Sequence, residues 1–134
     1  MNDRVTEDNY FLLDDDVREL AERVSFRISE KKDDSDTFSL DPLTIINIAN
    51  AVIGVIEFIY MCYSNNPKDV LWKMRDPGFF QRIMMKRELR RHIDRKDVDD
   101  AFLSLVEESY HMTKDDVASV LKTYESNQMF KKGE

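Results

Sequence analysis

The chain has one cysteine, three glycines and three prolines among its 134 residues. A single cysteine, Cys62, excludes an internal disulfide framework and favours a reducing, intracellular location such as the cytoplasm. So few glycines and prolines cannot supply the many tight turns of a β-sandwich or a barrel. These absences point to a helical protein.

Patterns typical of catalytic and metal sites are also missing. The only histidines, His92 and His111, have no ligand-type neighbour at metal spacing. We find no phosphate-cradling glycine-rich loop and no nucleophile elbow. The acids from Asp94 to Asp100 lack the glycine and the distal glutamate of a calcium loop. We therefore expect no metal, no cofactor and no enzymatic activity.

Apolar residues make up 42% of the chain and charged residues 35%, which suits a folded, soluble protein. The length fits a single domain, residues 1–134. The N-terminus is polar and acidic, so we expect no secretory signal there. The net charge of −7 is uneven, because residues 76–96 form a basic island in an otherwise acidic chain.

Helical spacing of apolar residues and helix-start signals predict an all-α bundle of five to six helices. The predicted helices cover residues 15–30, 43–63 and 67–74, then Pro77 to about Ile93, Asp94 to about Tyr110, and Thr113 to about Tyr124. Asp41 and Asp94 are expected caps, and Thr113 is expected to form a capping box with Asp116.

Three segments are predicted to lie outside this bundle. Residues 1–9 are expected to be loose, as is the C-terminal tail 127–134. Residues 31–39 are polar and read as a linker, which would let the first helix sit apart from the others.

Residues 43–63 form an exceptionally apolar helix, about 31 Å long at 1.5 Å per residue. That is long enough to span a bilayer, but the polar side chains make insertion marginal. Small and polar residues at helical spacing form one stripe along it: Asn47, Asn50, Ala51, Gly54 and Glu57. Such a stripe predicts close approach of another helix, with Glu57 buried. The favoured hypothesis is the central helix of a bundle, and the alternatives are self-association and a membrane span.

Residues 79–93 form an amphipathic helix with a basic face. The basic residues are Arg82, Lys86, Arg87, Arg90 and Arg91. Ile83, Met85, Leu89 and Ile93 are expected to face inward. The favoured interpretation is a solvated face balanced by the chain's own acids, Asp14–Asp16 and Asp97–Asp100. The alternatives are contact with phosphates and contact with an acidic protein partner.

Three aromatic residues surround the Pro77–Gly78 break: Trp72, Phe79 and Phe80. We expect them to close the core at a helix corner, and the alternative is a docking surface. The sequence leads to a non-enzymatic structural or interaction protein, such as a small helical subunit or adaptor of a larger or self-associated assembly. A nucleic-acid-associated regulator using helix 79–93 and a membrane-associated protein inserting helix 43–63 are the alternatives.

Overall fold

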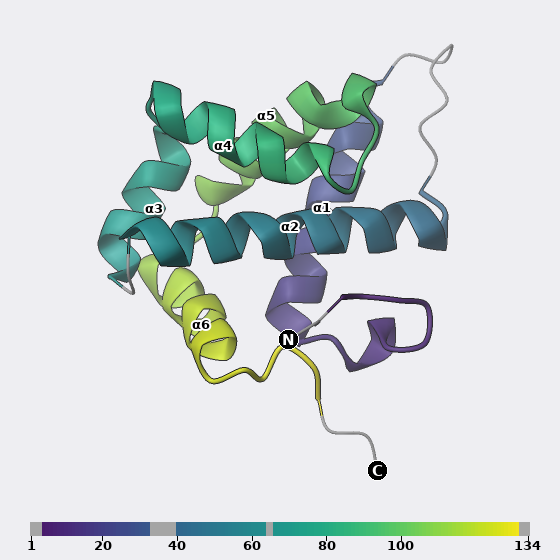
Figure 1. Cartoon of the computed structure of the whole chain (residues 1–134), viewed down its shortest axis with the longest axis horizontal. Helices are drawn as coiled ribbons and strands as arrows, with labels where there is room; N and C mark the ends of the chain where they lie inside the picture. Colours follow the sequence, from purple (N-terminus) through teal and green to yellow (C-terminus); the bar gives the residue numbers. More distant parts are fainter. Residues whose placement is uncertain (1–3, 33–39, 64–65, 132–134) are drawn as a thin grey trace.

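The computed structural model describes residues 4–32, 40–63 and 66–131. Within these ranges the chain forms six packed α-helices and no β-strand, which confirms the predicted all-α bundle (Figure 1). The helices are α1 (Asp15–Lys31), α2 (Pro42–Tyr63), α3 (Pro67–Arg75), α4 (Phe79–Arg90), α5 (Val98–Ser109) and α6 (Lys114–Glu125), with short 3₁₀ helices η1 (Tyr10–Leu12) and η2 (Arg95–Asp97).

Side-chain caps begin several of these helices, and those of Asp41 and Thr113 are as predicted from the sequence. Asp14 caps α1 by accepting hydrogen bonds from two backbone N–H groups. Asp41 does the same for α2, where it accepts from the Thr44 N–H at 2.8 Å. Thr113 and Asp116 form the reciprocal capping box of α6. These local bonds satisfy N–H groups that have no partner within the helix.

The corner between α4 and α5 differs from the prediction. Helix α4 ends at Arg90, three residues before Ile93, and the Asp94 side chain caps no helix. Instead the backbone tightens into the 3₁₀ turn η2, with the Asp97 N–H bonded to the Asp94 carbonyl at 2.9 Å. Helix α5 therefore begins only at Val98, after this turn has redirected the chain.

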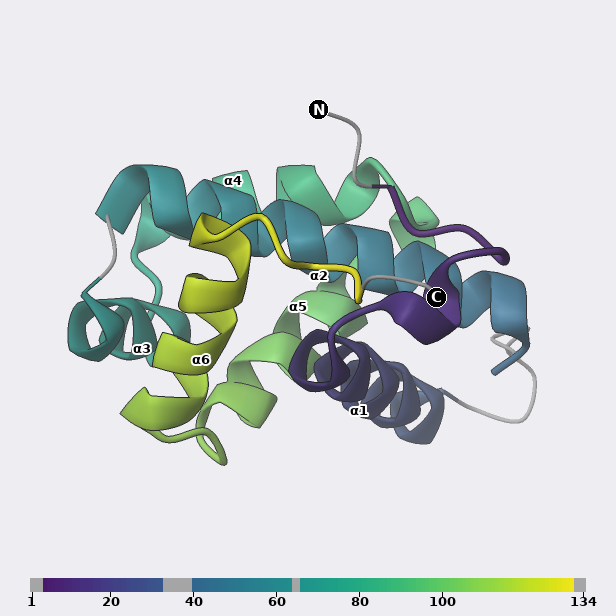
Figure 2. The same ribbon diagram turned by 90° about the horizontal axis from the view of Figure 1, so that it is seen from below.

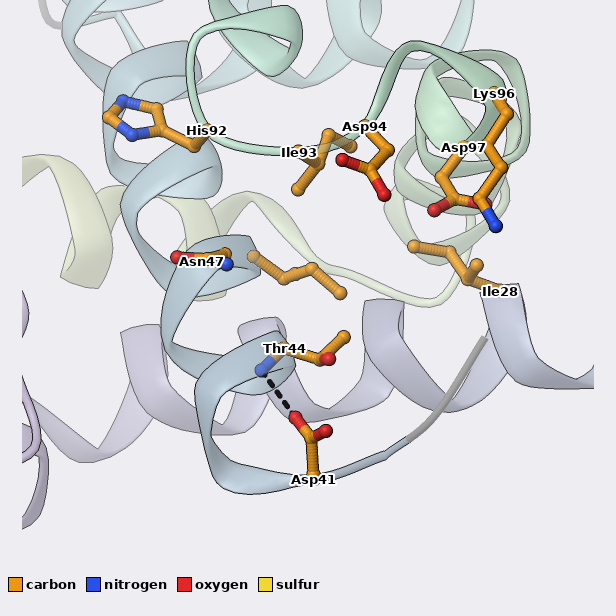
Figure 3. A pocket seen from close by; sticks show the side chains of 10 residues that line it. Ile28, Asp41, Thr44, Asn47, His92, Ile93, Asp94, Lys96 and Asp97 are labelled. Atoms are coloured by element: carbon orange, nitrogen blue, oxygen red, sulfur yellow. Dashed lines mark hydrogen bonds between the residues drawn. The ribbon is translucent and has the colours of Figure 1, made fainter. Parts of the chain in front are cut away.

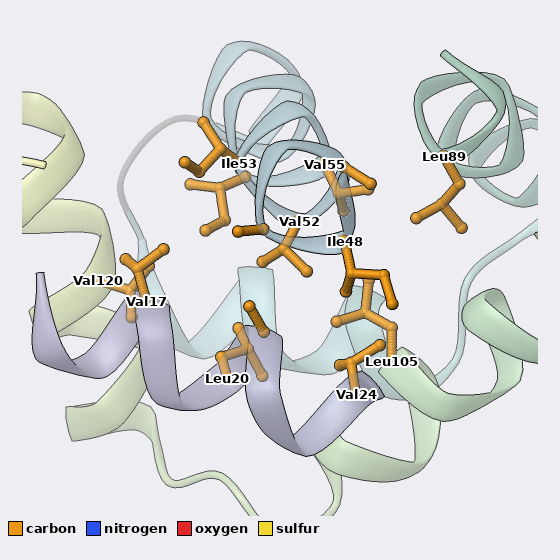
Figure 4. Packing of buried hydrophobic residues seen from close by; sticks show 14 of the residues in the cluster. Val17, Leu20, Val24, Ile48, Val52, Ile53, Val55, Leu89, Leu105 and Val120 are labelled. Atoms are coloured by element: carbon orange, nitrogen blue, oxygen red, sulfur yellow. The ribbon is translucent and has the colours of Figure 1, made fainter. Parts of the chain in front are cut away.

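Helix α2 is the centre of the bundle. It packs against α1 on one side and α4 on another, with α3 and α6 near its C-terminal end (Figure 1). Its inward side chains meet those of α1, α5 and α6 in one continuous core (Figure 4). A helix that is apolar on most sides needs such cover, because each exposed apolar side would cost free energy in water. The hypothesis of a central bundle helix therefore agrees with this packing.

Residues Pro42–Cys62 pass the length and composition test for a membrane span, with a mean hydropathy of 1.9. The same stretch is 56% buried inside the bundle. The core position of α2 accounts for its apolar character without a lipid phase.

The N-terminal helix does not sit apart, contrary to the prediction. Helix α1 packs against both α2 and α5, so it forms part of the core (Figure 2). Lys32, in the predicted linker 31–39, lies 2.8 Å from Asp97 and 2.9 Å from Asp100. These ion pairs fasten the end of α1 to α5. Residues 33–39 of that linker lie outside the described residues.

The prediction of loose termini is wrong for residues 4–9 and 127–131. Val5 is buried, and its backbone N–H and carbonyl both bond to the side-chain amide of Asn50, at 2.8 and 3.0 Å. Met129 is also buried, and Phe130 forms an antiparallel bridge with Leu13. Each segment is held by one or two apolar side chains and by hydrogen bonds of its backbone, which leave no periodic pattern in the sequence.

We expect Asn50→Ala to lower the free energy of unfolding by about 1–3 kcal/mol, because it leaves a buried backbone N–H and carbonyl of Val5 without partners. Asn47→Ala is the matched control, since Asn47 is half-buried on the same stripe. Its expected effect is within about 0.5 kcal/mol. Urea unfolding of both variants measures the difference. Equal effects would mean that the amide of Asn50 does not hold the N-terminal segment.

Candidate interaction surface

The polar stripe of α2 divides between three environments. Asn50 and Ala51 are buried, Asn47 and Gly54 are half-buried, and Glu57 is exposed. The predicted burial of Glu57 is therefore wrong. It lies near the C-terminal end of α2, where exposure avoids the cost of transferring a carboxylate out of water.

Gly54 is the point where the stripe meets another helix. A Cβ built at this position would lie 3.3 Å from Oε1 of Glu88 on α4 and 3.8 Å from its Cβ. The absence of a side chain lets α4 approach α2 closely, as the stripe predicts. The neighbour is thus a helix of the same chain.

The solvent-facing side of α4 carries an unusual set of exposed residues, which we call the α4 outer face. They are Phe79, Phe80, Arg82, Ile83, Arg87, Arg90 and Arg91. The opposite side of the helix is buried through Met85 and Leu89. Three large apolar side chains therefore occupy the first turns of this face, and arginines continue it toward the C-terminal end.

Little of the positive charge on this face is balanced by the protein itself. Lys86 lies 3.0 Å from Asp99 and 5.2 Å above the Phe102 ring. Arg91 lies 3.6 Å from Glu88. Among the described residues no ion pair is formed by Arg82, Arg87 or Arg90. Of the acids expected to balance this face, Asp99 is the one that pairs with it.

The aromatic residues around the Pro77–Gly78 break do not close the core, contrary to expectation. The exposed fractions are 66% for Trp72, 81% for Phe79 and 62% for Phe80. Ile83, which was expected to face inward, is 45% exposed. The inward positions of α4 are already filled by Met85 and Leu89, so Phe79, Phe80 and Ile83 face solvent. This outcome favours the docking alternative for Phe79 and Phe80.

A second surface was missed by sequence reasoning. An apolar groove of about 420 Å³ lies between the N-terminal segment and the start of α2, and we call it the N-terminal groove. Its apolar lining is Tyr10, Phe11, Pro42, Ile45 and Ile46. Its charged lining is Glu7 and Glu22, with no basic residue. The apolar run Tyr10–Leu13 is the sequence feature that could have indicated a contact surface here, and its Phe11 is 78% exposed.

A polar pocket of about 200 Å³ lies between the start of α2 and the corner that joins α4 to α5 (Figure 3). Two of its three acids have structural roles, because Asp41 caps α2 and Asp97 is paired with Lys32. The His92 ring lies apart from Asp94 and Asp97 (Figure 3). Within the described ranges no cluster of three His, Cys, Asp or Glu side chains suits a metal ion.

The broad groove between α1 and α5, about 570 Å³, is lined largely by charged residues that pair with one another. Glu108 is buried and lies 2.7 Å from Arg27 and 3.3 Å from Arg23. Arg23 also pairs with Glu19. These contacts close the bundle between α1 and α5 and pair the buried Glu108, while Glu22 and Glu30 add further negative charge to the groove.

Comparison of the chain with known protein families, curated proteins and solved structures finds no significant match.

The pKa of His92 depends on the charged groups around the end of α4. Burial lowers its pKa below the ordinary value of 6.5, and the positive charges of Arg4 and Arg91 lower it further, whereas Glu88 raises it. Because the unfolded chain then binds protons more readily, stability decreases as the pH falls from neutral through about 6.5. We expect NMR titration of His92 to give a midpoint below 6.5, and Arg91→Gln to raise that midpoint.

His92→Asn should make the unfolding free energy less dependent on pH between about 5 and 7, because it removes this titration. A midpoint at or above 6.5 in the folded protein would contradict the described surroundings of His92.

At position 54, the size of the introduced side chain should determine whether a substitution stabilises or destabilises the protein. Gly54→Ala gains about 0.5–1 kcal/mol of helix propensity, and the flexible end of Glu88 can move by a few tenths of an ångström. We therefore expect it to be neutral or stabilising. Gly54→Leu should cost about 1–3 kcal/mol, because a branched side chain forces α4 away from α2. Thermal unfolding of the pair tests the close approach, and a tolerated leucine would contradict it.

Proposed function

We propose that this protein is a non-enzymatic interaction protein that binds a protein partner through the α4 outer face. The proposal rests on one observation: the exposed side of this helix carries apolar and basic side chains that contribute little to the fold. Phe79, Phe80 and Ile83 are exposed within two turns, and Arg87 and Arg90 follow on the same side without an ion pair among the described residues.

Aromatic residues and arginine are the residue types enriched in protein interfaces, where they act as anchors. An apolar anchor costs free energy when it stays in water, and an unpaired arginine offers five donors for carboxylates. The complementary partner surface therefore combines an apolar pocket with carboxylates. Such a surface would bury Phe79 and Phe80 and pair with Arg87 and Arg90.

Nucleic-acid binding and membrane binding, the two alternatives, fit the properties of the α4 outer face less well. The net charge of −7 opposes approach to a polyanion. An interfacial helix buries a whole apolar side in lipid, but the apolar side of α4 is used against the bundle through Met85 and Leu89. Its outer face places apolar residues and arginines along one line, which suits a shaped protein surface better than a lipid plane.

The test is an affinity purification from the native source with wild type, Arg87→Glu/Arg90→Glu and the control Lys114→Glu/Lys122→Glu. The control reverses two exposed charges on α6. We expect one identified protein to be retained by wild type and control and lost with the α4 variant. With both proteins purified, the α4 variant should weaken binding at least tenfold, about 1.4 kcal/mol, as expected for loss of close charge pairs.

Phe79→Ala/Phe80→Ala should weaken the same complex, because it removes the apolar anchors and leaves the charge unchanged. Partners bound equally by all variants would refute the proposal. Salt-sensitive binding of wild type to a DNA duplex or to anionic vesicles, abolished by Arg87→Glu/Arg90→Glu, would replace it with one of the two alternatives.

A further inference from the structure

We propose that the α4 outer face of one copy docks into the N-terminal groove of a second copy, so that the protein associates head to tail. This inference rests on the proposed function, because it names the partner of the same face. The physical basis is complementarity between two surfaces of this chain, one apolar and basic and the other apolar and acidic.

The N-terminal groove offers what the α4 outer face requires. Its volume of about 420 Å³ lies in the range of sites that bind small molecules, so large side chains can enter it. Ile45 and Ile46 supply an apolar lining for Phe79 and Phe80. Glu7 supplies a carboxylate for an arginine.

The charge of the groove is not cancelled from within. Glu22 accepts a hydrogen bond from the Tyr10 hydroxyl at 2.5 Å. Burial and this glutamate raise the pKa of Tyr10, against the positive charge of Arg18, so the phenol stays protonated and donates to Glu22. No basic side chain lines the groove among the described residues. The groove between α1 and α5 differs, because Glu108 is already paired with Arg23 and Arg27.

The two surfaces cannot meet within one molecule. The groove lies at the N-terminal end of α2, beside Pro42 and Ile45. Helix α4 runs antiparallel to α2 (Figure 1), so Phe79 lies toward the C-terminal end of α2. The 22 residues of α2 place these ends about 30 Å apart. The contact is therefore between copies, and because it joins unlike surfaces it forms rings or open chains.

The experiment is sedimentation velocity at about 0.15 M salt, where screening leaves mainly the close charge pairs. The proteins are wild type, Arg87→Glu/Arg90→Glu, Glu7→Lys/Glu22→Lys and the variant with all four changes. We expect wild type to grow in mass with concentration in the micromolar range. Each double variant should raise the dissociation constant at least tenfold, and the fourfold variant should regain association, because its charges are exchanged.

Two controls keep the result interpretable. Lys114→Glu/Lys122→Glu should associate as wild type does. An equimolar mixture of the two double variants should associate although neither does alone, which also shows that both are folded.

Failure of this inference is separable from failure of the proposed function. A wild type that remains monomeric, double variants that associate as wild type does, or a fourfold variant and a mixture that both stay monomeric would each overturn head-to-tail docking. A different protein bound through Arg87 and Arg90 would leave the proposed function standing in that case.

Discussion

The need to cover α2 on most of its circumference determines the rest of the structure. A 22-residue helix with so few charges cannot present any broad side to water without a large cost in apolar exposure. The chain meets this need itself, with α1 crossing α2, α4 lying along it, and α3 and α6 toward its C-terminal end. The N-terminal segment adds further cover through Val5 and satisfies the amide of Asn50.

The need to cover α2 also distinguishes the residues of α4 that pack on the core from those whose apolar character the fold does not explain. Met85 and Leu89 of α4 are used to cover the core, and Glu88 fills the space left by Gly54. Phe79, Phe80 and Ile83 contribute little to that cover, because they are largely exposed. The core is complete without these three side chains, so packing of the bundle does not explain why they are apolar. That distinction supports the choice of the α4 outer face as the proposed binding surface.

Local signals in the sequence predicted the helices well. Caps such as Asp41 and Thr113, together with apolar spacing, depend on neighbours within a few residues, so they can be predicted without the fold. Non-local contacts could not be read in this way. Val5 is a single apolar residue and Met129 belongs to a pair with Phe130, both in polar surroundings, and their burial depends on partners far along the chain. The orientation of Ile83 depends on which side of α4 meets α2, and periodicity alone left that side ambiguous. The N-terminal groove is formed by three separate segments, of which the sequence signals only one, through the apolar run Tyr10–Leu13.

The bridge between Leu13 and Phe130 has a kinetic consequence. It joins strand-like segments that enclose nearly the whole chain, and it consists of two backbone hydrogen bonds, from Asp14 N–H to the Met129 carbonyl and from Lys131 N–H to the Leu12 carbonyl. Closing so long a loop is entropically costly unless the intervening helices have already packed. The N-terminal and C-terminal segments should therefore pair late in folding and separate early in unfolding. Unfolding would then begin at this bridge and proceed toward α2.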